Sequence, residues 1–344
     1  MLTFDSAYLR TMAVRVFRAA GAAEPVAVTV ADALVDASLV GHDSHGIIRI
    51  VEYVQQIRSG TVDPAAQPEI VKETSTTLLV DGHWGFGQVT ARWTMGKVIA
   101  KAKVHHIACA GIHRCGHIGL AGSYPAMAAQ EGLIGLAFVN GGGSEPRVAP
   151  FGGSRPVFGT NPLAAAIPTK DSSPILLDFS TAAVASGKIR IIRDKGELLP
   201  DGWILDREGS PSRLPEDYYQ GGMLLTAAGH KGYGLSILVE VLGGLLTSAG
   251  SLILPDSGYK VGNGVFLLAL NVEAFRPLDV FLDQVAELSA AVKAVPPLGE
   301  GEAVMLPGEI EQTTRKCRLA EGIPVSEGTW AKISNAAREL GVEI

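Results

Sequence analysis

Residues 41–50, GHDSHGIIRI, gather two histidines, an aspartate, a serine and an arginine around two glycines. We predict that a helix begins near Ser44, so that His45 and Arg49 project from the same face. An imidazole titrates near neutral pH and can transfer a proton, while a guanidinium can hold a carboxylate through two hydrogen bonds. The pair predicts proton transfer beside an acid group. In the alternative interpretation, His42 and its neighbours only cap the helix and His45 is half exposed.

A second group of reactive side chains lies in the segment HRCGHIG. On an extended strand His113, Cys115 and His117 would share a face, and such ligands can hold zinc or copper. The two glycines of the segment favour a loop instead, and no fourth ligand follows at a paired spacing. A metal-dependent lyase or hydrolase that uses these three residues stays open as an alternative class of enzyme.

Segments rich in glycine, proline and asparagine occupy residues 140–153, 158–168 and 307–309. Exposed main-chain amides in such turns can bind phosphates or a carboxamide, although ordinary turns have the same composition. Lys188 and Lys231 add positive charge, and Lys231 lies where a helix is expected to begin and could receive a diphosphate. The glycine fingerprint of the Rossmann fold is absent, so any nucleotide is held by another fold.

The elements that must position these residues change in character along the chain. Helical spacing of apolar residues dominates the first sixty positions, and a helical pattern returns at the C-terminal end. Between them, short apolar runs bounded by turn residues predict strands that are buried on both faces. These runs are TTLLVDG, IACAGIH, LIGLAFVN, LAAAIPT, PILLDFS and VFLLALNV, and helical patterns fall at 88–104, 119–130, 231–247 and 279–294.

The pattern predicts an α/β protein of the mixed α+β kind in two domains. A helical domain would comprise residues 1–72, completed by 276–344, and a mixed-sheet domain at 73–275 would bind cofactor and substrate. Asp178, at the end of one predicted strand, could orient a histidine or bind a ribose, or it could simply end the strand in a turn.

Composition excludes several classes of partner. The net charge is −6 over 344 residues, without a run of lysine or arginine, so we expect neither nucleic acid nor a membrane as partner. Three cysteines suggest no disulfide framework and the first residues do not resemble a signal peptide, which together predict the cytoplasm. The apolar stretch 235–255 approaches the length of a membrane span, but Glu240 and several glycines favour a buried helix.

Taken in order, the motifs resemble those of the malate and L-lactate dehydrogenase family of the second, non-Rossmann type. The resemblance covers nearly the whole chain and rests on GHDSHGI, LLVDGHWGFGQ, FGTNP, PILLDFS, HKGYG and LPGE. Within that family, the motifs resemble those of the hydroxycarboxylate dehydrogenase B group. Two departures stand out, because many members have Asn-Ser where this chain has Arg114 and Cys115, and often a serine where Ala182 and Ala183 follow LLDFST.

The resemblance implies hydride transfer between NAD or NADP and a 2-oxo or 2-hydroxy acid, of the malate, lactate or aromatic hydroxycarboxylate type. Reduction of a cyclic imino acid such as piperideine-2-carboxylate is the alternative within the family. It also implies a non-Rossmann mixed sheet, a helical domain built from both termini, and a homodimer. The histidine of the DSHG motif, His45, would be the acid and base, whereas the carboxylate role of Arg49 is inferred from charge and geometry.

We therefore predict catalytic roles for His45, Arg49 and Asp178, and substrate contacts from Ser44, His45, Arg49 and His117. The cofactor contacts follow from the resemblance, with Lys188 added from its charge. They are His117, Ile118, Gly119, Leu120, Gly159, Thr160, Asn161, Ile175, Leu176, Leu177, Asp178, Phe179, Lys188, Gly229, His230, Lys231, Pro307, Gly308, Glu309 and Ile310.

Overall fold

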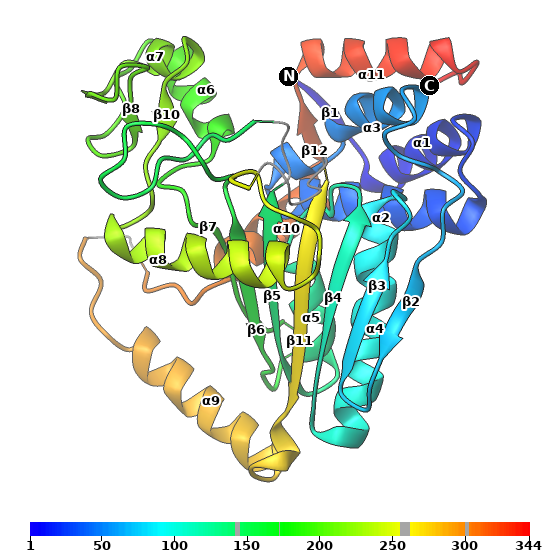
Figure 1. Cartoon of the computed structure of the whole chain (residues 1–344), viewed down its shortest axis with the longest axis vertical. Helices are drawn as coiled ribbons and strands as arrows, with labels where there is room; N and C mark the ends of the chain where they lie inside the picture. Colours follow the sequence, from blue (N-terminus) through cyan, green and yellow to red (C-terminus); the bar gives the residue numbers. More distant parts are fainter. Residues whose placement is uncertain (142–144, 172, 255–261, 300–302) are drawn as a thin grey trace.

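The centre of the protein is a seven-stranded sheet in the order β2-β3-β4-β11-β5-β6-β7 (Figure 1). The computed structural model describes residues 1–141, 145–171, 173–254, 262–299 and 303–344. Only β3 and β4 run parallel, and the other neighbouring strands are antiparallel. The strands are β2 (Glu69–Glu73), β3 (Thr77–Asp81), β4 (Ile107–Cys115), β5 (Leu133–Gly141), β6 (Pro162–Ile167), β7 (Ile175–Ser180) and β11 (Asn263–Asn271).

The six apolar runs that predict strands all form strands of this sheet. Alternate residues of β5 are buried and half-buried, which is the period of two that a pleated strand imposes. The edge strand β2 has no such signal, because its sequence EIVKE leaves every residue except Ile70 exposed. The fold class predicted from the sequence, a mixed α/β protein, is confirmed.

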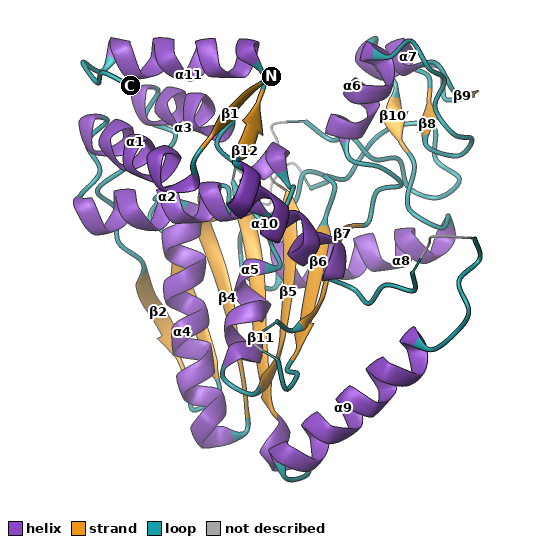
Figure 2. Cartoon of the chain, turned by 180° about the vertical axis from the view of Figure 1, so that it is seen from behind, coloured by secondary structure: helices purple, strands orange, loops and turns teal. Residues whose placement is uncertain are grey.

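Helices cover both faces of the sheet. The helices α4 (Gly87–His105) and α5 (Ser123–Gln130) pack on one face, and α8 (His230–Val239) with the π-helix η2 (Glu240–Leu245) packs on the other (Figures 1 and 2). The part of the apolar stretch 235–255 that forms α8 and η2 therefore packs on the sheet through one side only. The expected buried helix is only half-buried, because Ile237, Leu238, Val241 and Leu245 are exposed. A Cβ atom on Gly243 would lie 2.9 Å from the amide nitrogen of Asn140, so glycine allows η2 to approach the sheet. Among the described residues no helix is long and apolar enough to cross a membrane.

A helical layer lies at one end of the sheet. It contains α1 (Ser6–Ala19), α2 (Glu24–Leu39), α3 (Arg49–Arg58) and α11 (Glu327–Glu339), joined by pairing of β1 (Leu2–Phe4) with β12 (Ile323–Val325) (Figure 2). Side chains from both chain termini share its buried core. By contrast α9 (Leu278–Lys293) lies at the opposite end of the sheet in both views. The domain boundaries given above stay a prediction.

A small lobe lies beside the helical layer and was not predicted from the sequence. It contains the three-stranded sheet β10-β8-β9, made of β8 (Ile204–Leu205), β9 (Pro211–Ser212) and β10 (Met223–Leu224), with α6 (Ser186–Asp194) and α7 (Pro215–Tyr219). The remaining elements are α10 (Glu309–Glu321), which packs against α2, and the 3-10 turns η1 (Asp43–His45) and η3 (Val272–Ala274). The lobe and the helical layer face each other across the end of the large sheet (Figure 1).

Candidate active site

A cavity of about 380 Å³ lies where the helical layer, the sheet and the small lobe meet. This volume is within the range of roughly 300–1,000 Å³ that is usual for small-molecule sites. Its lining brings together many of the residues singled out from the sequence. These are Ser44, His45, Arg49, His117, Ile118, Gly119, Leu120, Gly159, Thr160, Asp178 and Phe179.

The helix that was expected near Ser44 begins five residues later, at Arg49. Residues Asp43–His45 form the 3-10 turn η1, and Gly46 follows with an extended ψ of −154°. A Cβ atom on Gly46 would lie 2.1 Å from the Oγ atom of Ser38, so the chain presses against α2 at this point. The prediction that His45 and Arg49 share one helical face was wrong, yet both side chains line the cavity.

Arg49 is held in place by its own helix and turn. Its Nε donates to the carbonyl oxygen of Ser44 at 2.6 Å, and its Nη1 donates to Oε2 of Glu52 at 2.5 Å. A guanidinium has five N–H donors, so these contacts leave donor capacity for a carboxylate in the cavity. Glu52 was not predicted, and its i,i+3 spacing from Arg49 is the signal that could have identified it.

His45 and His117 lie face to face in the cavity wall, with ring centroids 5.3 Å apart and ring planes 9° from parallel. The pKa of His45 is lowered to about 4, mainly by burial and to a smaller extent by the charges of Arg49 and His42. His45 is therefore neutral at pH 7. Its Nδ1 atom is buried and has no hydrogen-bond partner among the described residues, as expected of a group whose partner is a ligand.

His117 is supported by two residues that the sequence analysis did not place in the site. Its Nδ1 lies 2.7 Å from the hydroxyl oxygen of Tyr53, and that oxygen accepts a hydrogen bond of 2.7 Å from Nε2 of Gln88. Burial lowers the pKa of His117 well below its usual range, and Arg49 and His45 add to the effect. Tyr53 appeared in the sequence only as part of an apolar helical stripe.

Asp178 lies in β7 and reaches the cavity from the sheet side. Burial raises the pKa of its carboxyl group to about 6, although a hydrogen bond of 2.6 Å from the amide of Gly122 and the charge of His42 oppose the shift. Glu311 of α10 also raises this pKa, and it contacts Nε2 of His42 at 3.3 Å. Asp178 is therefore a carboxyl group with a raised pKa in the same cavity as His45.

Asn161 was predicted beside the cofactor but does not line the cavity. Its side chain is fully buried and donates to Oε2 of Glu240 at 2.8 Å, and it also donates to the carbonyl oxygen of Ser236 at 3.2 Å. The other carboxylate oxygen of Glu240 accepts from Ser251 at 2.5 Å. Asn161 thus anchors the wall formed by its neighbour Thr160. The signal for Glu240 was a single acidic residue in a long apolar stretch.

Several other predicted cofactor residues also lie outside the lining of the cavity. The amide of Leu176 donates to the carbonyl oxygen of Pro307 at 3.0 Å, so the predicted strand and the predicted loop are neighbours. The amine of Lys188 lies 5.4 Å from the ring centroid of Trp203. Cofactor contacts remain predictions for Ile175, Leu176, Leu177, Lys188, Gly229, His230, Lys231, Pro307, Gly308, Glu309 and Ile310.

The cavity also has a wall that the sequence analysis missed. It comes from the small lobe and the segment after β5, and it includes Glu145, Arg147 and the start of α6 at Ser186 and Gly187. The hydroxyl of Tyr218 links this wall, because it accepts from Nη1 of Arg147 at 3.2 Å and lies 2.6 Å from Oγ of Ser186. Residues 142–144 of the predicted glycine-rich segment lie outside the described residues.

The metal interpretation required His113, Cys115 and His117 to share one face. A β-bulge in the pairing of β4 with β11 prevents this, since two residues of β4 lie opposite one of β11, and Arg114 has a positive φ of 48°. The bulge turns Cys115 into the core, where it is fully buried. Within the described part of the chain, no group of three or more His, Cys, Asp or Glu side chains is arranged to hold a metal ion.

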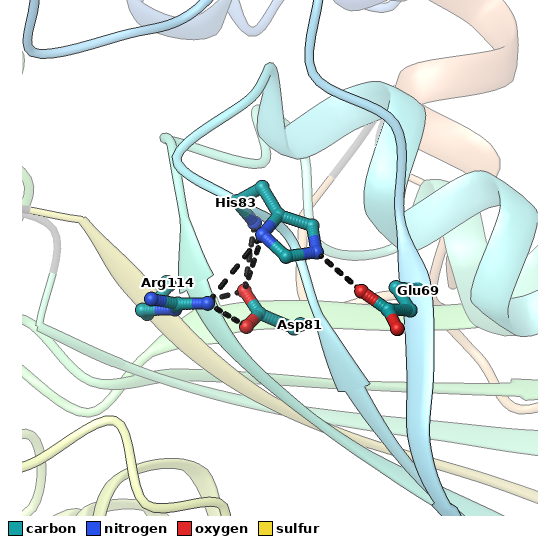
Figure 3. A network of polar contacts seen from close by, with 4 residues as sticks. All are labelled: Glu69, Asp81, His83 and Arg114. Atoms are coloured by element: carbon teal, nitrogen blue, oxygen red, sulfur yellow. Dashed lines mark hydrogen bonds and ion pairs between the residues drawn. The ribbon is translucent and has the colours of Figure 1, made fainter.

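Arg114, one of the departures from the family pattern, is directed away from the cavity. Its Nε donates to Oδ1 of Asp81 at 2.9 Å, its Nη2 contacts the other carboxylate oxygen, and His83 links the pair to Glu69 (Figure 3). Through these contacts Arg114 fixes the loop between β3 and α4. At this point of the chain Arg114 and Cys115 do not line the cavity, and its wall begins at His117.

Comparison with known proteins agrees with the motifs. Residues 4–334 match the family model described as malate/L-lactate dehydrogenase. Hydroxycarboxylate dehydrogenase B of Escherichia coli is 38% identical, and the match covers 98% of this chain and 94% of that protein. The malate dehydrogenase of Pyrococcus horikoshii is 34% identical with a TM-score of 0.89, over 99% of this chain and 96% of the other.

A further structure with the same fold is the delta1-piperideine-2-carboxylate reductase of Pseudomonas syringae. It is 29% identical with a TM-score of 0.86, and the match covers 98% of this chain and 100% of that protein. The match to the family model spans nearly the whole chain, and the sequence motifs, the mixed sheet and the site geometry agree with it. The chain therefore belongs to the malate/L-lactate dehydrogenase family and is an oxidoreductase.

Proposed function

We propose that this protein transfers a hydride between NAD or NADP and a 2-oxo or 2-hydroxy acid of the malate, lactate or aromatic hydroxycarboxylate type. The observation that carries the proposal is the meeting of His45, His117 and Arg49 in one cavity. Two neutral imidazoles can transfer a proton and donate a hydrogen bond there, and the guanidinium can hold the acid group.

The cavity suits a nicotinamide cofactor in two respects. Ile118 and Val139 give it an apolar wall against which a flat ring can pack, and Gly187 at the start of α6 has no atom within 4 Å of the position a Cβ would take. Backbone amides at the start of a helix favour anionic groups such as a diphosphate. When bound, the cofactor supplies the hydride that is exchanged with the carbon bearing the oxygen.

His45 transfers the proton that the substrate oxygen gains or loses. In the oxidation direction its neutral imidazole accepts the proton of the substrate hydroxyl, because its lowered pKa keeps it unprotonated at pH 7. In the reduction direction the imidazole donates its proton to the substrate oxygen. Burial is the main cause of its low pKa, and a carboxylate bound at Arg49 offsets the smaller part that comes from the Arg49 charge. Ser44 and His117 line the same cavity and are proposed to contact the same substrate.

Asp178 belongs to the proposed catalytic group because its carboxyl group gains or loses a proton near pH 6 inside the cavity. Its ionised form can accept a hydrogen bond from a ribose hydroxyl, and its neutral form can donate one. Both forms fit a cofactor at this wall.

Reduction of a cyclic imino acid is the second candidate, and the similarity to the Pseudomonas reductase favours it. The same groups would serve it, since an imine carbon accepts a hydride and its nitrogen needs a proton. A panel of 2-oxo acids and cyclic imines, assayed with NADH and with NADPH by loss of absorbance, tests both. We expect turnover of a 2-oxo acid; turnover of imines alone would favour the second candidate, and no turnover at all would contradict both.

We further propose a cytoplasmic homodimer. Apolar side chains are exposed on α8 and η2, on Leu246 directly after η2, which is 60% exposed, and on α9, with Leu288 61% exposed. Exposed apolar surface favours association between protein chains. Light scattering of the purified protein should give twice the monomer mass of 36.0 kDa, and a monomer at micromolar concentration would contradict the proposal.

A further inference from the structure

A buried chain of three side chains leads from the core to the cavity wall. Gln88 in the first turn of α4 donates to the hydroxyl oxygen of Tyr53 on α3, and that oxygen lies 2.7 Å from Nδ1 of His117. Tyr53 and Gln88 are each 1% exposed, so water cannot take over either contact. His117 follows β4, and the three residues therefore come from three separate elements that meet only in the folded protein.

The cost of burying unpaired polar groups decides which atoms donate and which accept along these three side chains. As arranged, the Gln88 amide donates one hydrogen bond to the Tyr53 hydroxyl and leaves its carbonyl oxygen without a partner among the described residues. Turned over, the carbonyl oxygen would face the hydroxyl and both N–H groups of the NH2 would lack a partner among the described residues. Buried unpaired N–H groups are rarer in proteins than under-satisfied carbonyl oxygens, so the observed arrangement is favoured. The Tyr53 oxygen thus accepts from Gln88 and has its own proton to donate.

The ionisation states agree with that direction. Burial raises the pKa of Tyr53 above its usual range, so the hydroxyl keeps its proton, and burial lowers the pKa of His117, so the imidazole is neutral. A neutral imidazole has one N–H group and one acceptor nitrogen. If Nδ1 accepts from Tyr53, the proton must be on Nε2, at the edge of the ring that is turned away from Tyr53.

We propose that Tyr53 and Gln88 are positioning residues that fix His117 as the Nε2–H tautomer, so that it presents a hydrogen-bond donor to the substrate oxygen. The inference rests on the proposed function and assigns a different role to each of the two stacked histidines. His45 exchanges the proton, and His117 donates one fixed hydrogen bond while charge develops on that oxygen. A donor that is already oriented stabilises such charge without reorganisation during the reaction.

The tautomer can be measured directly, without substrate. In protein labelled with 15N-histidine, two-bond 15N–1H correlation spectra distinguish Nε2–H from Nδ1–H, and the His117→Gln variant assigns the signals. We expect Nε2–H in the wild type and a mixture of tautomers in Tyr53→Phe. A wild-type His117 in the Nδ1–H form would overturn the proposal, and so would a Tyr53→Phe spectrum identical to that of wild type, whatever the effect on turnover.

Kinetics supply the second test. Tyr53→Phe should lower kcat roughly 10- to 100-fold, less than the outright loss of an oxyanion donor, and should leave cofactor affinity unchanged. Tyr8→Phe, on the exposed side of α1 and away from the cavity, is the matched control and should keep wild-type kcat. An unchanged kcat in Tyr53→Phe would overturn the role in catalysis.

Gln88→Leu provides a variant that keeps the Tyr53 hydroxyl. Compared with Tyr53→Phe, it should shift the tautomer balance of His117 less and lower kcat less. A larger effect than that of Tyr53→Phe in either measurement would contradict the proposal that Gln88 acts on His117 through Tyr53. The NMR result does not depend on turnover. If the wild type reduced no acid or imine but showed the Nε2–H form, the proposed function would fail while the assignment of the tautomer would stand.

Discussion

The imidazole rings of His45 and His117 are stacked almost parallel, with centroids 5.3 Å apart, although 72 positions separate them in the chain (117 − 45 = 72). One ring comes from the turn before α3 and the other from the loop after β4. Both are neutral, because burial and the charge of Arg49 lower both pKa values. This stack is where a proton carrier and a hydrogen-bond donor can act on the same substrate atom.

Replacing His45 with glutamine should abolish most of the turnover while leaving cofactor binding intact. General acid–base catalysis contributes roughly 100- to 10,000-fold, so kcat should fall by about that factor. Cofactor affinity can be followed through the fluorescence of the four tryptophans. Equal losses of kcat and cofactor affinity would argue against a proton-transfer role.

Arg49→Met should have two effects that share one cause, the loss of a positive charge. The KM for a 2-oxo acid should rise, and the pKa of His45 should move up from about 4 toward its usual 6.5, because Arg49 now lowers it. NMR titration of His45 measures the second effect. Arg58→Met is the matched control, since Arg58 lies on the same helix but pairs with Glu339, and it should change neither value.

Asp178→Asn should stabilise the protein progressively as the pH rises from about 4, with the full effect above about pH 6. In the wild type the folded carboxyl group holds its proton up to about pH 6, whereas the usual pKa is 3.8, so wild-type stability falls as pH rises between these values. Asparagine carries no charge and escapes this loss. The melting temperature of the variant should exceed that of wild type at pH 7.5 and match it at pH 4, and the exposed Asp171→Asn should show no such crossover.

Gly187→Leu should weaken cofactor binding without harming the fold. Gly187 is the second residue of α6, lines the cavity, and has no atom within 4 Å of the Cβ position, so a side chain there would enter the proposed cofactor space. Gly328 is the second residue of α11 and is equally uncrowded, which makes Gly328→Leu the matched control. We expect at least a roughly tenfold rise in the cofactor Kd for Gly187→Leu alone. Similar Kd values in both variants would place the cofactor elsewhere.

The sequence was sufficient for six of the seven strands of the large sheet, all except β2, and for the first part of the site. Strand runs such as LIGLAFVN are apolar over their whole length, and this signal does not depend on distant residues. His45 and Arg49 were found together because only four positions separate them in the sequence. The same local reasoning placed the start of the helix wrongly, because it could not include the packing of this segment on α2, where the amide of Ile47 donates to Oγ of Ser38 at 3.1 Å.

Local patterns could not find residues whose partners lie far along the chain. Glu240 looked like an isolated charge in an apolar stretch, yet it accepts from Asn161, 79 positions away (240 − 161 = 79). The bulge that turns Cys115 into the core depends on pairing between β4 and β11, and residues 113–117 alone do not show it.

What the sequence determined by itself is the chemistry available: a histidine and an arginine four positions apart, a second histidine after a strand, and turns rich in glycine, proline and asparagine. What only the tertiary structure decided is how these groups are tuned. Burial sets the neutral state of both histidines, packing of α3 on α4 brings Tyr53 and Gln88 to His117, and α10 brings Glu311 to His42 across 269 positions. The physical reason is that desolvation and hydrogen-bond geometry depend on everything packed around a group, whereas a sequence pattern records only its neighbours along the chain.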